Sequence, residues 1–326
     1  MGIARIFRRL GQLITLTSCA TLVTVSHAAE TQPIQVAAVS SATNRLLNLD
    51  QDKIELASVS AAVIDARTGA PLFQKHADMV MPIASITKVM TAIVTLDAGL
   101  PLNERITFTQ AQRKANNNYF TRIRVDSTLP REDVIRIALM SSENMAASAL
   151  GHSYPGGIDA FVKAMNAKAA ELGMSQTRFV DPTGLSEHNV STAGDLALLV
   201  RAAATYPEIR EYSTTKGFTA RFKKPRYTLR YGNTNVLVHR KSWDIDVTKT
   251  GYLNEAGRCL VMMTQIQGRD TVMIMLNSYG KRTPIGDAGR IKRWITTGKS
   301  GKISDSAHHY QRQQLKQRLP EELALN

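Results

Sequence analysis

A single lysine inside an otherwise apolar segment constrains this chain more than any other feature. The segment Pro82–Thr91 reads PIASITKVMT, and Lys88 is the only charged residue from Ala84 to Leu96. The run predicts a helix that is apolar on every side and must therefore be buried. Because a buried ammonium group loses its hydration, lysine is rarely buried without a partner or a function.

A serine lies one helical turn before this lysine. Ser85 and Lys88 have the spacing i and i+3, which places a hydroxyl and an amine on one face of the helix. Desolvation lowers the pKa of an amine, and a neutral amine accepts the proton of a serine, so the pair can form a nucleophile without histidine. Ser213 and Lys216 have the same spacing, but the mixed sequence after them predicts no buried helix.

A second motif, SEN, falls where one predicted helix ends and another begins. Its Ser142 and Asn144 offer a hydroxyl and an amide that can relay a proton and orient both the lysine and a substrate. The structural alternative is simple helix capping, because Ser and Asn favour helix starts. Taken alone, this motif does not distinguish the two.

A third motif, KTG, leads towards a predicted buried strand. At a sheet edge, Lys249 adds positive charge, Thr250 offers a hydroxyl to a carboxylate, and Gly251 lets a substrate backbone come close. Residues 299–301 have a similar pattern, KSG, but lie in a polar stretch with no predicted strand around them.

The chain as a whole predicts an α/β (α+β) fold with one antiparallel sheet. Strands are predicted near both ends and helices between them, so the chain leaves the sheet, builds an all-helical insert and returns. The predicted strands are 60–66, 70–75, 235–243, 258–267 and 271–276. The predicted helices are 85–98, 129–139, 158–173, 192–203 and 288–295.

The first residues predict an export signal. Three arginines precede an apolar run from Leu10 to Val25, and small residues at Ser26 and Ala28 suit a signal peptidase. We therefore expect a periplasmic protein with a signal peptide over 1–28, a linker over 29–44, one domain over 45–298 and a polar tail over 299–326. Cys19 in LTSC offers a lipoprotein as the alternative, although the residues after it stay apolar where a polar tether is expected.

Cysteine and histidine predict neither a disulfide nor a metal site. Loss of Cys19 with the leader leaves Cys259 alone, so no intrachain disulfide can form. Cys259 lies in GRCLVMM, a predicted buried strand, and is read as a core residue. The histidines show no metal-ligand spacing, and we expect no metal and no cofactor.

The three motifs in this order resemble the signature of penicillin-binding proteins and class A β-lactamases. FVDPTGL (179–185), STAGDLALL (191–199) and NTNVL (233–237) extend the resemblance to the low-molecular-mass penicillin-binding proteins of the D-alanyl-D-alanine carboxypeptidase and endopeptidase family. The resemblance covers residues 56–294 and implies a β-lactamase/transpeptidase-like fold. The wording SSENMAA and the short C-terminal part are most similar to the endopeptidases of that family.

The resemblance also implies roles for the residues of the motifs. Ser85 would be the acylated nucleophile and Lys88 its general base. Ser142 and Asn144 would be the proton relay and the lysine partner.

On the substrate side, the resemblance implies that Lys249 and Thr250 hold the carboxylate-bearing part. The backbone N–H groups of Ser85 and Tyr252 would form the oxyanion hole, in which each donor contributes about 10²- to 10³-fold to the rate. Arg282 in GKRT is a weaker candidate for carboxylate binding.

The activity that the resemblance implies is hydrolysis of the D-alanyl cross-bridges of peptidoglycan, with β-lactam antibiotics as inhibitors. A D-alanyl-D-alanine carboxypeptidase is the alternative. A β-lactamase would need an ExxLN glutamate between the second and third motifs, and none occurs there. A β-lactam sensor would need transmembrane helices, which the sequence after the leader does not predict, and we expect peripheral membrane contact at most.

The chain is strongly basic, with a formal net charge of +14. Eight basic residues and no acidic one fall within 216–241, interleaved with aromatic residues. Such a stretch suits an anionic or nucleic-acid partner. Because an exported protein seldom meets nucleic acid, we expect no nucleic-acid partner and a hairpin that faces the cell wall or is simply solvated.

Overall fold

The structure is a computed structural model that describes residues 49–115 and 120–318. The predicted signal peptide, the lipoprotein alternative at Cys19 and the linker over 29–44 lie outside the described residues, so they stay predictions. All described residues belong to one compact unit. In the part of the chain that the structure covers, no helix combines the length and apolar character needed to span a bilayer.

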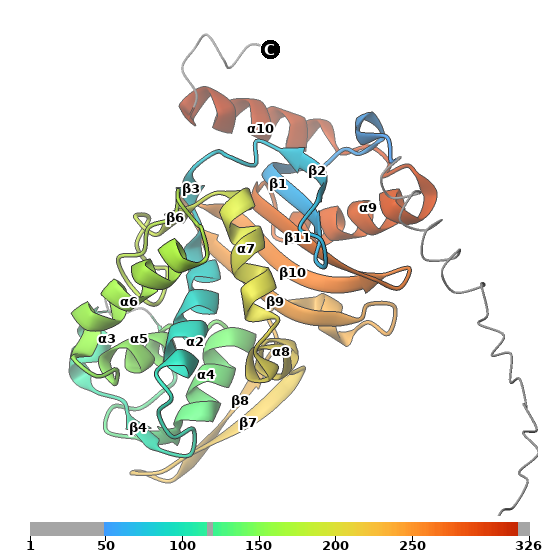
Figure 1. The fold of residues 1–326 in the computed structure, drawn as a ribbon. Coiled ribbons are helices and arrows are strands. Elements are labelled where there is room, and N and C mark those ends of the chain that lie inside the picture. The colour runs from blue at the N-terminus through green and yellow to red at the C-terminus, as the bar shows by residue number, and fades with distance from the viewer. Residues whose placement is uncertain (1–48, 116–119, 319–326) are drawn as a thin grey trace, which may run out of the picture. The chain divides into compact units, whose positions relative to one another are not determined.

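The sheet has five antiparallel strands in the order β2-β1-β11-β10-β9. Figure 1 shows that the chain leaves the sheet after β2, builds the helical insert and returns at β9. This confirms the predicted antiparallel sheet interrupted by an insert. The strands are β1 Ser58–Asp65, β2 Pro71–Lys75, β9 Ile245–Leu253, β10 Gly257–Ile266 and β11 Arg269–Ser278.

Both faces of the sheet are covered, which explains why its central strands are apolar on both sides. Alternate residues of β11 enter two different cores: Met273 packs with Trp294 of α9 (Thr283–Thr297), whereas Ile274 joins the core shared with α7 (Ala193–Ala203). Figure 1 shows α9 and α7 on opposite faces of the sheet. All residues of β1 are buried in consequence.

The insert surrounds α2 (Thr87–Asp97), which a 3-10 turn over Ala84–Ile86 precedes. Every residue of α2 from Thr87 to Thr95 is buried, as the apolar sequence predicted. The other helices of the insert, besides α7, are α3 Gln110–Ala115, α4 Arg131–Met140, α5 Asn144–His152, α6 Gly157–Glu171 and α8 Pro207–Thr214. All of these except α3, together with α7, lie around α2 and contact it directly.

The insert is not all-helical, so that expectation was wrong. It also contains three two-stranded sheets. Two of them consist of strands with only two or three residues, which are too short to produce an alternating pattern. The pairs are β3 Met81–Pro82 with β6 Val190–Ser191, β4 Arg105–Thr107 with β5 Thr128–Pro130, and β7 Gly217–Phe222 with β8 Tyr227–Gly232.

The prediction of a strand over 235–243 was also wrong. Val236–His239 form a 3-10 turn, and the strand begins only at Ile245. The side chain of Asn235 causes the difference, because its Oδ1 accepts from the backbone N–H of Leu237 at 3.0 Å and thereby caps the turn. Its Nδ2 donates to Thr248 Oγ1 at 2.9 Å and fixes the turn against β9.

The segment expected as a polar tail contains a packed helix, α10 (Asp305–Arg318). Its attachment is polar, because Gln311 Nε2 donates to the carbonyls of Leu56 and Ser58 at 2.7 and 3.1 Å. Tyr310 and Leu315 also pack against the core, but the fully buried residues of α10 are Ala307 and Gln311, so its apolar face is narrow and interrupted by a polar residue.

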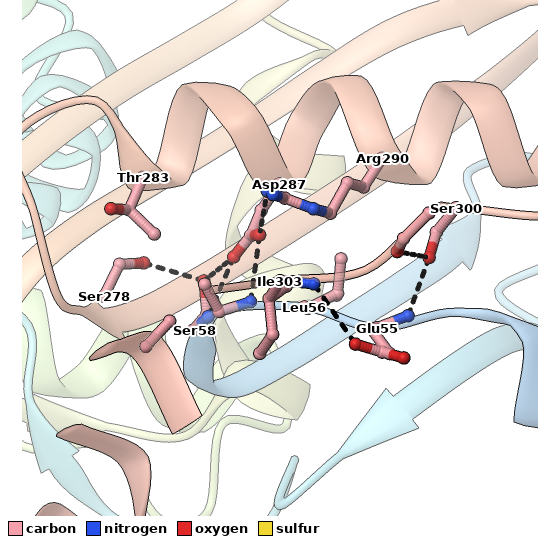
Figure 2. Close-up of polar contacts among 12 residues, drawn as sticks. Glu55, Leu56, Ser58, Ser278, Thr283, Asp287, Arg290, Ser300 and Ile303 are labelled. Atoms are coloured by element: carbon pink, nitrogen blue, oxygen red, sulfur yellow. Dashed lines mark hydrogen bonds and ion pairs between the residues drawn. The ribbon is translucent and has the colours of Figure 1, made fainter. Parts of the chain in front are cut away.

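A buried carboxylate joins the start of β1 to α9 (Figure 2). Asp287 accepts from the N–H of Ala57 at 3.0 Å, and from the N–H and hydroxyl of Ser58 at 2.8 and 2.6 Å. Ser278 of β11 bonds the same hydroxyl at 2.7 Å. Burial raises the pKa of Asp287, and these donors oppose the rise by stabilising its ionised form.

Substitution of Asp287 is expected to destabilise the fold. Asp287→Ala leaves the buried donors of Ala57 and Ser58 without an acceptor, which should lower the free energy of unfolding by about 2–4 kcal/mol. Asp287→Asn keeps one acceptor oxygen and should cost less. Urea denaturation measures both, with Asp270→Asn as the control at an exposed position. Equal stability of Asp287→Ala and the control would contradict a structural role for this carboxylate.

Candidate active site

The three predicted motifs meet at one cleft between the insert and the sheet. Ser85 lies in the turn before α2, Ser142 lies between α4 and α5, and Thr250 lies on the edge strand β9. All three line a cleft of about 1220 Å³. Lys88 and Lys249 lie beneath it, with 0% and 1% of their surface exposed.

Lys88 contacts three oxygen atoms from three segments. Its Nζ lies 2.8 Å from Ser85 Oγ, 2.7 Å from Asn144 Oδ1 and 2.5 Å from the carbonyl of Thr183. Burial lowers the pKa of Lys88 to about 7, against a weaker opposing effect of nearby carboxylates. A neutral amine has two N–H groups for Asn144 and Thr183, which leaves its lone pair for the hydroxyl of Ser85.

Lys249 forms a second buried contact with the SEN motif. Its Nζ lies 2.9 Å from Ser142 Oγ and 2.8 Å from the carbonyl of Thr250. Burial lowers its pKa well below the ordinary value, and the positive charge of Lys88 lowers it further. Ser142 has a φ of 62°, a conformation that is uncommon for a residue other than glycine and that often marks functional sites.

The loop that presents the carbonyl of Thr183 is shaped by one carboxylate. Asp181 accepts from the N–H groups of Thr183, Gly184 and Ser186 at 2.6, 2.8 and 3.0 Å. This turn directs the Thr183 carbonyl at Lys88. The sequence marked the segment DPTGL, but the contact to Lys88 was not predicted because a carbonyl group belongs to every residue type.

Two glycines allow this loop and β9 to approach the backbone of Ser85. Gly184 has a φ of +76°, and a Cβ there would lie 2.0 Å from the carbonyl oxygen of Ala84. A Cβ on Gly251 would lie 3.2 Å from the nitrogen of Ser85. Position 184 therefore requires glycine, whereas a Cβ at Gly251 would fit only if the backbone around the serine shifted slightly.

The remaining predicted residues lie along the rim of the cleft. Thr250 Oγ1 bonds Thr234 Oγ1 at 2.7 Å, a contact that the sequence did not predict. Tyr252 is 48% exposed, and the guanidinium of Arg258 lies 3.6 Å from its ring centre. Arg282 is exposed and lines the cleft, but no hydrogen bond joins it to the other predicted residues among those the structure describes.

The two similar sequence patterns, Ser213 with Lys216 and the KSG of residues 299–301, are not assembled in this way. Ser213 is buried and accepts from the N–H of Thr248 at 3.3 Å, while Lys216 is exposed. Ser300 accepts from the N–H of Glu55 at 2.8 Å beside Asp287 (Figure 2). Cys259 is a buried residue of β10, and burial raises the pKa of its thiol to about 11. In the described part of the chain, no group of His, Cys, Asp and Glu side chains is arranged to hold a metal ion.

The fold and the site define a serine hydrolase of the penicillin-binding class. Residues 47–280 match the model of the D-alanyl-D-alanine carboxypeptidase family, and the chain belongs to this family of serine DD-peptidases. It is 48% identical to a D-alanyl-D-alanine endopeptidase of Escherichia coli strain K12 and 49% identical to that of Pseudomonas aeruginosa. Each match spans 81% of this chain and 85% of the relative.

Solved structures agree with this assignment. The DD-transpeptidase of Streptomyces K15 is similar with a TM-score of 0.70 and 28% identity, over 75% of this chain and 98% of that one. Penicillin-binding protein D2 of Listeria monocytogenes, in its ampicillin-bound form, has a TM-score of 0.65 and 29% identity, over 75% and 99% of the chains. The predicted transpeptidase-like fold and the family are therefore confirmed.

A methyl group on Gly184 is expected to displace Ser85. Gly184→Ala places a Cβ against the backbone of Ala84, so the rate at which labelled penicillin modifies the protein should fall by about 10²-fold. Gly268→Ala is the matched control, because its φ is also +76° but no atom lies within 4 Å of the added Cβ. A penicillin reaction equally fast in both variants would show that the Gly184 contact does not position the serine.

Proposed function

We propose that this protein is a periplasmic DD-endopeptidase that hydrolyses the D-alanyl cross-bridges of peptidoglycan through an acyl-enzyme on Ser85. The contact of 2.8 Å between Lys88 Nζ and Ser85 Oγ, made by an amine whose pKa burial lowers to about 7, is the observation that carries the proposal. The similarity to endopeptidases of two organisms supports the choice of bond. The export signal of the sequence supports the compartment.

In the acylation step, neutral Lys88 accepts the proton of Ser85 Oγ. The oxygen attacks the carbonyl carbon of the D-alanyl peptide bond and forms a tetrahedral oxyanion. Backbone N–H groups of Ser85 and Tyr252 are the proposed donors to that oxyanion. When the C–N bond breaks, the proton that Lys88 took from Ser85 passes by way of Ser142 to the leaving amine, so that Lys88 is neutral again and an ester on Ser85 remains.

Deacylation consumes one water molecule. Neutral Lys88 takes a proton from water, the resulting hydroxide attacks the ester carbonyl, and Ser85 Oγ leaves and regains its proton. The hydroxyl of Thr250 faces the cleft and is the proposed contact for the carboxylate of the substrate. Lys249 is buried and contacts Ser142, so its proposed role is to orient that hydroxyl.

The alternative function is a D-alanyl-D-alanine carboxypeptidase. Carboxypeptidases also resemble this chain, at 28% identity for DacF of Bacillus subtilis and 32% for DacB2 of Mycobacterium tuberculosis. Both are more distant than the endopeptidases of Escherichia coli and Pseudomonas aeruginosa, which favours the endopeptidase.

The bond specificity is open to a direct measurement. Purified cross-linked peptidoglycan treated with the enzyme should lose its dimeric muropeptides and gain monomers, with little free D-alanine released from pentapeptide monomers. Chromatography of the muropeptides measures both products, and Ser85→Ala should produce neither. Rapid release of D-alanine with intact dimers would establish the carboxypeptidase instead.

The acylation rate should depend on pH through Lys88. Below about pH 7 Lys88 is charged and cannot accept the serine proton, so the rate of adduct formation with penicillin should fall about tenfold per pH unit. Above about pH 7 the rate should level off. Intact-protein mass spectrometry follows the adduct, which should be long-lived and map to the peptide that contains Ser85.

Two variants separate this effect from other titrations. Lys88→Arg keeps its charge at every accessible pH and should lose acylation throughout. Lys216→Arg changes an exposed lysine that has the same spacing from a serine, and this variant should behave as the unmodified protein. A rate independent of pH between about 5 and 9 would contradict Lys88 as the base, and turnover of penicillin without an adduct would indicate a β-lactamase.

A further inference from the structure

A strongly basic surface covers the hairpin β7–β8 and the turn that follows it. Eight basic residues lie within 216–241, all of them are exposed, and the range contains no acidic residue. Within the described ranges, none of the eight forms an ion pair with a carboxylate. This basic hairpin surface consists of Lys216, Arg221, Lys223, Lys224, Arg226, Arg230, Arg240 and Lys241.

The hairpin is held in place and presents these charges on a fixed frame. Phe222 is buried and stacks on Tyr227, with ring centres 4.6 Å apart. Close to the hairpin turn, Lys223 exchanges two backbone hydrogen bonds with Thr128 of β5, at 2.8 and 3.0 Å. A surface fixed in this way binds a ligand without first paying the entropy of ordering a loop.

Two further exposed arginines extend the basic hairpin surface along β8. The guanidinium of Arg122 lies 5.1 Å from the ring centre of Tyr231, and that of Arg124 lies 4.8 Å from Tyr227. Arg122 also donates to the carbonyl of Arg230 at 2.8 Å. Like charges are thus held close together, and in the described chain neither arginine forms an ion pair with a carboxylate, which is the pattern of a surface complementary to an anionic partner.

The segment that carries the basic hairpin surface reaches the catalytic cleft at its C-terminal end. Arg240 belongs to both, because it lines the cleft. After β8 the chain reaches Thr234, whose hydroxyl bonds that of Thr250 in the cleft at 2.7 Å. Figure 1 shows β7 and β8 along the edge of the insert beside α4, on the side away from α9 and α10.

We propose that the basic hairpin surface, with Arg122 and Arg124, binds the free carboxylates of peptide stems in polymeric peptidoglycan, outside the cross-bridge being cut. The inference rests on the proposed function, because the segment that carries this surface reaches the cleft, so a ligand on it belongs to the same polymer as the substrate. Stems that are not cross-linked end in carboxylates, which arginine and lysine bind by charge-assisted hydrogen bonds. The consequence is a preference for the polymer over soluble fragments.

An anionic lipid surface fits these observations less well. A peripheral membrane site combines basic residues with apolar side chains that enter the bilayer. Among the described residues of this surface and its immediate neighbours, the exposed large apolar side chains are Val236 and Phe120, which lie in separate segments and do not form one apolar face. Carboxylates of the polymer therefore remain as the partner.

Binding can be separated from catalysis in a Ser85→Ala background, which leaves the polymer uncut. A hairpin variant replaces four residues by glutamine: Arg221, Lys223, Lys224 and Arg226. At low salt it should bind purified peptidoglycan about tenfold more weakly than its parent, the Ser85→Ala protein with the hairpin unchanged. Its binding should also respond less to added salt. The matched control removes the same charge on α6, α9 and α10, through glutamine at Lys163, Arg293, Arg312 and Lys316, and should bind like the parent.

Chemical modification of the polymer identifies the partner. Peptidoglycan whose carboxylates have been converted to amides should bind the parent as weakly as native peptidoglycan binds the hairpin variant. Binding that survives amidation, or equal binding by the hairpin and control variants, would overturn the proposal. Binding to vesicles of anionic phospholipid in place of peptidoglycan would overturn it in favour of a membrane surface.

A catalytic measurement distinguishes this proposal from the proposed function. With Ser85 restored, the hairpin variant should cleave soluble dimeric muropeptides and react with penicillin at rates within about twofold of those of the unmodified protein. Its release of fragments from intact peptidoglycan should be about tenfold slower. If the unmodified protein cleaves no cross-bridge, the proposed function fails, whatever the binding result. If the unmodified protein cleaves cross-bridges and the hairpin variant releases fragments at the same rate, only the inference about the surface fails.

Discussion

The site depends on the desolvation of one amine. Lys88 is buried between the turn that carries Ser85, the start of α5 and the loop that contains Thr183. Each of these segments supplies one oxygen atom, so the amine stays hydrogen-bonded although water is excluded. Burial without these partners would cost several kcal/mol, and partners in bulk water would leave the pKa of the lysine near its ordinary value. The insert wrapped around α2 provides both conditions.

A second buried lysine makes the protonation of the site a shared property. Lys249 contacts Ser142 directly, while Asn144, two residues further on, contacts Lys88. The short SEN segment therefore connects both amines, and the charge on Lys88 lowers the pKa of Lys249. Two positive charges in one desolvated site oppose each other, so loss of a proton from either amine favours retention by the other. Ser142 lines the cleft and contacts Lys249, so it lies between the cleft and this pair of amines.

The sequence predicted the residues of the candidate site better than the contacts and elements that hold them in place. Ser85 and Lys88 were identified because a charged residue in an apolar helix is chemically unusual, and that signal needs no tertiary structure. The carbonyl of Thr183 has no side-chain signature. The prediction of a strand around Asn235 failed because a short run of consecutive apolar residues, VLV at 236–238, also fits a 3-10 turn, whose cap residue is held by a tertiary contact with β9. Helix α10 was missed because its inner face is narrow, and the polar Gln311, which attaches it through hydrogen bonds, interrupts the apolar contacts of Tyr310 and Leu315.

The order of the strands determines how a peptide can reach the serine. The first strand, β1, lies between β2 and β11, and Asp287 fixes its start to α9. The return strand β9 is therefore left at the edge, where one row of its backbone N–H and C=O groups has no neighbouring strand. Gly251 brings this edge into contact with the backbone of Ser85. We expect that an extended peptide pairing with the free part of β9 would reach the hydroxyl of Ser85, because this strand and the turn that carries the hydroxyl pack directly against each other.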